Sequence, residues 1–228
     1  MTGTVSAEPG RVPGTVVGST RALLACGVVA GPLYIVLVVL QMLTRDGFDI
    51  GRHPASLLSN GAQGWIQIVN FAVTGLLFVA YAIGLRRLRE PGAGRAWVPR
   101  LVGVFGAGMV GAALFSADPV DGFPPGTPTG PPTSVSWHGM LHFLVAGVAF
   151  LALIAACFGF ARRFASAGRR GWAVFSATTG GLFLAGWMSI FVLAGSRPAN
   201  VAFAVAIGLV LTWTSLLAAH HLGRAREG

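Results

Sequence analysis

Two histidines, His138 and His142, form the clearest chemical pattern in the sequence. Residues four apart on a helix lie on one face, and two imidazoles at this spacing can share a zinc ion. Carboxylates in nearby loops, from Asp118, Asp121 or Asp49, would complete a mixed nitrogen and oxygen shell. The pattern therefore predicts an acid/base or metal centre with these five candidate residues, and His138, His142 and Asp118 as its candidate metal ligands.

The same two histidines are also consistent with a structural role. His138 would then lie at the membrane interface, and His142 would hydrogen bond to Asn70, to a serine or to a loop carbonyl across the bundle. Gly139 follows His138, where zinc proteases of the His-Glu-x-x-His type carry glutamate, so the sequence does not support protease chemistry. Metal binding and the structural role both remain open at this point.

The segment from Phe48 to Gly61 is too varied for a plain linker, and we expect it to be ordered. Ser56 to Ser59 are predicted to form one short turn, with Leu57 and Leu58 pointing into lipid or into the bundle. The serines would cap the turn or line a pocket. The candidate ligand-binding residues of the whole chain are His53, Ser56, Ser59, Asn70 and Arg197.

The later segment from Asp118 to Ser136 contains six prolines and three glycines, which favours a turn-rich cover or a flap. Asp118 and Asp121 could direct both carboxylates toward one ligand, or each could simply stabilise a turn. Arg197, in a short Gly-Ser-Arg-Pro turn, could hold a phosphate or carboxylate head group of a lipid, or form an ion pair with an aspartate of the loops.

These residues must be positioned by membrane-spanning helices. The chain is 54% hydrophobic and 10% charged, which is too apolar for a soluble domain of 228 residues. About 20 apolar residues cross a bilayer. Six uncharged stretches of about this length predict an all-α, polytopic membrane bundle of six transmembrane helices, at approximately Ala22–Leu43, Trp65–Leu85, Leu101–Ala117, Trp137–Phe160, Trp172–Gly195 and Ala199–Ala219.

Residues 1–20 are predicted to be a disordered cytoplasmic N-terminus, residues 21–222 the transmembrane domain, and residues 223–228 a cytoplasmic tail. The orientation follows from arginine. With both ends of the chain in the cytoplasm, thirteen of the sixteen basic residues lie inside and only Arg45, Arg52 and Arg197 lie outside. We therefore expect a multi-pass protein of the cell membrane, with the loops around residues 45–63 and 118–136 facing out. Arginines placed between apolar runs give no reason to expect nucleic acid as a partner.

The bundle is also expected to contain repeated helix hairpins. A shift of 72 residues aligns eight identical residues in thirty-five ungapped positions, including two aspartates and a tryptophan. If the first two hairpins are related, Asp49 would lie beside Asp121, and Asn70 beside His142, around a shared outer cavity. The third helix carries glycines at positions 103, 106, 108 and 111, which predict close packing against its neighbours.

Three segments in order, HPASLLSNGAQGWIQIVNF, DPVDGFPPGTP and SWHGMLHF, resemble a six-helix bacterial membrane family known as domain of unknown function 998, common in actinobacteria. The resemblance covers roughly Leu24 to Leu222. It implies the six-helix topology and a grouping of the loop aspartates, serines and histidines, and it implies no substrate or cofactor.

Two functions from different classes are consistent with these patterns. One is a lipid-binding or accessory membrane protein, whose polar outer cluster holds the loops on the bundle. The other is an enzyme that processes a lipid or isoprenoid at the outer leaflet, with a divalent metal such as zinc or an acid/base pair at His138 and His142. We expect the first, with membrane lipids as partners; whether there are protein partners, and which, is not given by the sequence. Charge-coupled transport is disfavoured, because the helices carry no charged residue.

Overall fold

The structure is a computed structural model, and it describes residues 14–88 and 96–227. This part of the chain contains six long helices and one short helical turn, and no strand. The elements are α1 (Gly14–Thr44), η1 (Ala55–Ser59), α2 (Gly64–Arg87), α3 (Trp97–Leu114), α4 (Trp137–Ser166), α5 (Arg170–Val192) and α6 (Arg197–Glu227). All six long helices of this part are long and apolar enough to cross a membrane. The predicted all-α membrane bundle is therefore confirmed.

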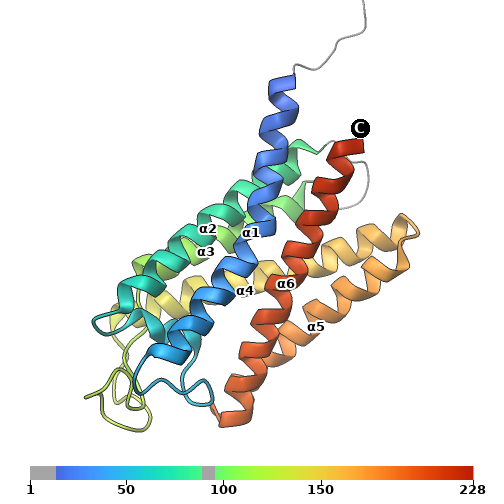
Figure 1. The fold of residues 1–228 in the computed structure, drawn as a ribbon. Coiled ribbons are helices and arrows are strands. Elements are labelled where there is room, and N and C mark those ends of the chain that lie inside the picture. The colour runs from blue at the N-terminus through green and yellow to red at the C-terminus, as the bar shows by residue number, and fades with distance from the viewer. Residues whose placement is uncertain (1–13, 89–95, 228) are drawn as a thin grey trace, which may run out of the picture.

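The six helices close into a ring. Each helix packs against the next one along the chain, and α1 packs against α6. In Figure 1 the C-terminal end of α6, the start of α1 and the α4–α5 turn lie at one end of the bundle. The opposite end, called the loop end below, carries residues 45–63, 115–136 and 193–196. A ring of this kind has an interior, because helices on opposite sides do not fill it completely.

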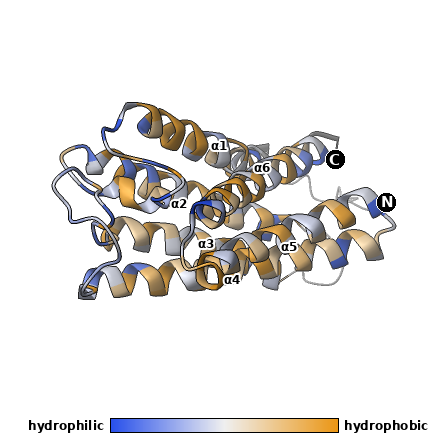
Figure 2. Cartoon of the chain, turned by 90° about the horizontal axis from the view of Figure 1, so that it is seen from below, coloured by the Kyte–Doolittle hydropathy of each residue, from blue (hydrophilic) through white to orange (hydrophobic). Residues whose placement is uncertain are grey.

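The outer surface of the ring is apolar. Figure 2 shows hydrophobic residues along the helices and hydrophilic ones gathered toward the ends. Large apolar side chains such as Leu43 (78%) and Val192 (79%) are exposed on helices, which fits contact with lipid rather than water. Trp65 and Trp137 begin α2 and α4 and are exposed, as expected for residues anchoring a helix at the membrane interface. The chain is a multi-pass membrane protein.

Several helix boundaries differ from the prediction. Helix α1 begins at Gly14, so residues 14–20 are helical instead of disordered, and α6 continues to Glu227 through the expected tail. Hydropathy locates only the apolar part of a helix, whereas the backbone hydrogen bonds continue beyond it. Residues 1–13, 89–95 and 228 lie outside the described residues, and with them Arg11, Arg89 and Arg95 of the orientation argument.

Helix α3 ends at Leu114, three residues before the predicted end at Ala117. Phe115 is extended, and its carbonyl accepts a hydrogen bond from His142, while the carbonyl of Ala117 accepts one from Asn60. These carbonyls accept hydrogen bonds from α4 and from the first loop, residues 45–63. The chain therefore leaves the helix here, although its residues remain apolar.

The predicted close packing of the third helix is present. An added Cβ on Gly106 would lie 2.7 Å from the carbonyl oxygen of Gly75, and one on Gly75 would lie 2.6 Å from that of Gly106. On the next face of α3, a Cβ on Gly108 would lie 2.5 Å from that of Ala149 on α4. These approaches bring α2, α3 and α4 together at backbone distance and so hold the ring closed on this side.

Candidate functional site

An ion pair joins the two long loops at the loop end. Arg52 donates from Nε to Oδ2 of Asp121 (2.9 Å) and from Nη2 to Oδ1 (2.6 Å), a bidentate contact. The N–H of Gly130 adds a bond of 2.9 Å to the same carboxylate. Hydrogen bonds from Arg52 and Gly130 lower the pKa of Asp121 to about 2, so this carboxylate is ionised over the physiological range.

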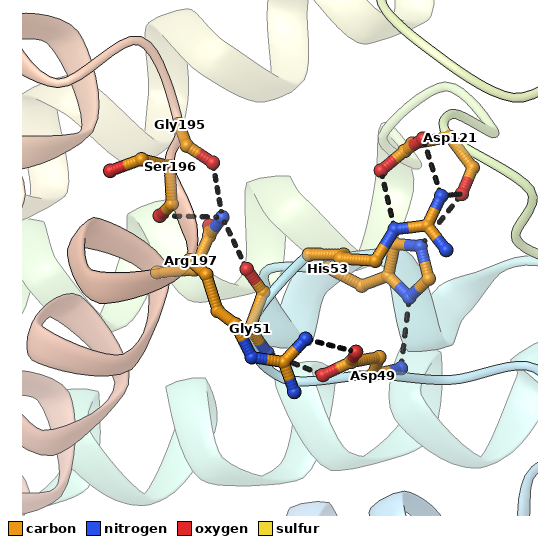
Figure 3. Close-up of polar contacts among 9 residues, drawn as sticks. Asp49, Gly51, His53, Asp121, Gly195, Ser196 and Arg197 are labelled. Carbon is orange, nitrogen blue, oxygen red and sulfur yellow. Dashed lines mark hydrogen bonds and ion pairs between the residues drawn. The ribbon is translucent and has the colours of Figure 1, made fainter.

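A second ion pair joins the first loop to the last helix. Nη1 of Arg197 lies 2.8 Å from Oδ2 of Asp49 (Figure 3). The Gly51 N–H donates to Oδ1 of Asp49 (2.8 Å), and this bond first and Arg197 next lower the pKa of Asp49 below its usual range. Beside them, the side-chain amide of Asn200 donates to the carbonyl of Gly51 (3.2 Å). Arg197 thus forms the ion pair with a loop aspartate that the sequence left open.

His53 links the two loops from inside. Its side chain is 1% exposed and lies between the rings of Phe48 and Phe123, with centroids 5.5 and 5.4 Å away. The Asp49 N–H donates to Nδ1 (3.0 Å), so the neutral ring carries its proton on Nε2, which donates to the carbonyl of Asp121 (3.0 Å). Figure 3 shows both bonds. Both ring nitrogens are occupied, which makes His53 a structural link between the loops.

Asp118 has partners of its own. It accepts from the N–H of Ser136 (2.8 Å) and from the Ser136 hydroxyl (2.5 Å), and that hydroxyl accepts from the Gly139 N–H (3.0 Å) as the N-cap of α4. Asp118 and Asp121 therefore bind different groups rather than one shared ligand, in keeping with the turn-stabilising alternative.

The two histidines at the start of α4 lie in different environments. His138 is exposed and stacks on Trp137, with ring centroids 3.6 Å apart. His142 is 4% exposed, and its Nδ1 lies 2.8 Å from the carbonyl oxygen of Phe115. The latter is the loop-carbonyl contact that the sequence offered as the structural alternative. Within the described residues, no group of three His, Cys, Asp or Glu side chains is arranged to hold a metal ion.

The remaining candidates serve the helices and the turn. Asn70 is buried and donates to the carbonyl of Tyr34 (3.3 Å) and to Oε1 of Gln67 (3.2 Å), so its recorded partners do not include His142. The predicted turn is present as η1, where the Ser59 hydroxyl donates to the Ser56 carbonyl (2.7 Å). The repeat of the helix hairpins stays a prediction.

These loops cover a cavity inside the helix ring. The cavity has a volume of about 330 Å³. The first loop contributes Pro54 to Leu57 to its lining, and the second loop contributes Ala117, Asp118 and Val120. Leu57 and Leu58 are buried, so η1 packs onto the bundle beneath the ion pairs. We call this space the central cavity.

The wall of the central cavity is largely aromatic. Phe150 of α4 contacts Phe183, Trp187 and Phe203 of α5 and α6, with ring centroids 5.3, 5.5 and 5.7 Å apart, and all four line the cavity. His142 borders it from α4. A second hollow of about 310 Å³ lies between α1 and α6 and shares Tyr34, Pro54, Ala55, Phe203 and Ile207 with it.

Sequence reasoning offered an ion pair between Arg197 and a loop aspartate, but it did not identify Arg52 as the partner of Asp121, Ser136 as the partner of Asp118, or the aromatic wall. Arg52 counted only as an orientation signal, although its position beside His53 in an ordered loop could have suggested an acidic partner. Phe150 and Trp187 gave no signal, because an aromatic residue that lines a cavity looks like one that faces lipid when both lie in apolar helices.

One of three comparisons with known proteins found a match. Residues 28–220 match the family model described as a protein of unknown function, DUF998, which spans the ring and both loops. Neither the curated proteins nor the solved structures contain a match to the chain. With its six helices and their loop cover inside the matched region, the chain belongs to the DUF998 family of membrane proteins.

Proposed function

We propose that this protein binds the apolar chain of a membrane lipid in the central cavity. The observation that carries the proposal is an aromatic-lined space of about 330 Å³ inside a ring of membrane helices, covered at the loop end by two tied loops. Pockets for small molecules typically measure about 300–1,000 Å³ and have mainly apolar walls with a few polar groups. An apolar cavity of about 150 Å³ already accepts benzene.

The cavity has access from the side. Phe143 and Phe191 both line it, and they are 65% and 66% exposed on the lipid-facing surface of α4 and α5. A chain can therefore reach the cavity between these helices without leaving the apolar phase. The two loops cover the loop end, and the path between α4 and α5 leads from the bilayer to the cavity along apolar side chains.

We place the protein in the cell membrane with both chain ends in the cytoplasm and the loop end outside. Support comes from the arginines. All three at the loop end bind loop groups: Arg45 donates to the carbonyls of Leu58 and Asn60, Arg52 pairs with Asp121, and Arg197 pairs with Asp49. Of the other thirteen, the ten within the described residues belong to segments of the opposite end, as the bias toward cytoplasmic arginine requires.

The biochemical role that follows is lipid binding or an accessory role in handling lipid, with membrane lipids as partners. Most polar candidates of the loop end already bind one another: His53, Asp49, Asp121 and Asp118 all have protein partners. These contacts hold the two loops in place over the bundle, and the central cavity beneath the loops is where the ligand binds.

The test asks whether the protein binds one lipid chain, and whether that binding is lost when a larger side chain fills the cavity. Protein in a mild nonionic detergent would be incubated with stearyl alcohol, stearyl phosphate or stearylamine and examined by native mass spectrometry. Ala146 and Ile207 line the cavity, so Ala146→Phe and Ile207→Trp should abolish binding. Val148→Phe adds the same ring on the exposed face of α4 and should bind like the wild type. Variants that remain folded by circular dichroism and still bind every probe normally would refute the proposal.

An enzyme acting on a lipid is the second candidate, and His142 is the observation that favours it. Its imidazole borders the cavity and is held through Nδ1, as the general base of a catalytic pair would be. Chemical conversion of a bound probe during incubation, lost in His142→Asn while binding persists, would identify an enzyme.

A further inference from the structure

The polar groups on the wall of the central cavity indicate which lipid it takes. The hydrogen bond of His142 determines its tautomer: the carbonyl of Phe115 can only accept, so the proton of the neutral ring lies on Nδ1. Nε2 then carries a lone pair. Among the described residues no partner for Nε2 is recorded, and the side chain is 4% exposed and borders the cavity. The wall thus presents a hydrogen-bond acceptor, on a largely buried side chain, for which the described residues supply no donor.

The charges around the cavity favour a neutral ligand. Among the described residues that line it, Asp118 is the one that carries a charge, and it lies close enough to His142 to interact with it electrostatically. None of the three arginines of the loop end lines the cavity, and all three bind other groups. An anionic head group would therefore meet a carboxylate and no compensating guanidinium, an arrangement that selects against anions.

A positively charged head group is not needed either. The Asp118 carboxylate already accepts two hydrogen bonds from Ser136 and lies at the N-terminus of α4, where the helix dipole favours negative charge. Its charge is thus stabilised by the protein. An amine entering the cavity would lose its hydration without being required to neutralise a buried anion.

We infer that the ligand is an uncharged lipid with a hydroxyl group, such as a long-chain or isoprenoid alcohol or a glyceride, whose O–H donates to Nε2 of His142. The inference rests on the proposed binding of an apolar chain. The hydroxyl lies beneath the loops, and the chain extends along Phe150, Trp187 and Phe203. A hydroxyl is both small and a donor, which suits an acceptor without a donor in a largely apolar wall.

Trp187 provides a probe, because it lines the cavity. Dibrominated stearyl alcohol, its phosphate ester and the corresponding amine would be titrated into the protein in nonionic micelles at neutral pH. The part of the tryptophan fluorescence quenching that disappears in Trp187→Phe reports binding in the cavity. We expect the alcohol to reach half-saturation at a concentration at least about tenfold lower than the phosphate, and lower than the amine.

Two variants test the named groups. His142→Phe keeps a ring but removes the acceptor, and should weaken alcohol binding about fivefold, the effect of one hydrogen bond. Asp118→Asn keeps an acceptor for Ser136 while removing the charge, and should reduce the preference for alcohol over phosphate. Equal or tighter binding of the phosphate or the amine, or a preference unchanged in both variants, would overturn the inference and leave chain binding intact. If no probe quenches Trp187, the proposed function itself fails.

Discussion

A substitution of His53 distinguishes a structural role of this loop histidine from a chemical one. Replacing it with phenylalanine keeps a ring between Phe48 and Phe123 but removes both of its hydrogen bonds, to the Asp49 N–H and to the Asp121 carbonyl. The first loop would keep its ion pair from Arg52 to Asp121 and the hydrogen bond from Asn60 to the Ala117 carbonyl, but would lose the link that runs through the buried ring. His53→Phe should therefore reduce the stability of the folded protein.

The size of the effect follows from the two bonds. A buried hydrogen bond contributes about 1 kcal/mol net, and a donor or acceptor left without a partner costs about 1–3 kcal/mol. The Asp121 carbonyl keeps a hydrogen bond from Nη2 of Arg52 (3.0 Å), so only the Asp49 N–H is left without a partner. One lost bond and one abandoned group give a loss of about 2–4 kcal/mol in the free energy of unfolding. His138 supplies the control, because it is exposed and stacks only on Trp137; His138→Phe should change stability by less than about 0.5 kcal/mol.

Both variants would be unfolded in mixed micelles with increasing mole fraction of dodecyl sulfate, followed by circular dichroism. The expected order of stability is wild type, then His138→Phe close to it, then His53→Phe well below. Equal stability of His53→Phe and the wild type would refute the structural assignment of His53, and so would a larger loss in His138→Phe.

Three further predictions concern pH and packing. Because the folded pKa of Asp121 is lowered to about 2, the stabilisation from its pair with Arg52 is fully present above the usual carboxyl pKa of about 4 and is lost as pH falls from there through about 2. The difference in stability between wild type and Asp121→Asn should therefore be constant from neutral pH to about pH 4 and disappear between about pH 4 and pH 2. Gly106→Ala should cost about 1–3 kcal/mol in the same unfolding assay, whereas Gly181→Ala, on a side of α5 with no atom within 4 Å of the new Cβ, should cost nothing. Leu58→Ala should cost about 2–5 kcal/mol and the lipid-facing Leu43→Ala almost nothing, and similar losses for the two would show that η1 is not packed on the bundle.

Hydropathy and the lack of charge within each stretch predicted the number and order of the helices, because each span had to contain enough consecutive apolar residues to cross a bilayer. They could not predict how far the helices extend. Residues 223–227 continue α6 after the apolar stretch has ended. Residues 115–117 are apolar but lie outside α3, because the carbonyls of Phe115 and Ala117 accept hydrogen bonds from His142 and Asn60.

The candidate site was predicted in part. The loop residues identified from their type do gather at one end, and the loop turn at Ser56 to Ser59 is present. Their partners were not predictable, since the pairing of Arg52 with Asp121 depends on where two loops meet, 69 residues apart in sequence. The spacing of His138 and His142 suggested one shared ion; in the structure one ring is exposed at the start of α4 and the other is buried one turn deeper.

The most direct measurement of the central claim is the position of a bound chain. Crystals grown with dibrominated stearyl alcohol would give anomalous scattering from bromine, and the account predicts a peak in the central cavity beside Phe150, Trp187 and Phe203. Bromine found only on the outer, lipid-facing surface of the helices, with no peak in the cavity, would contradict it.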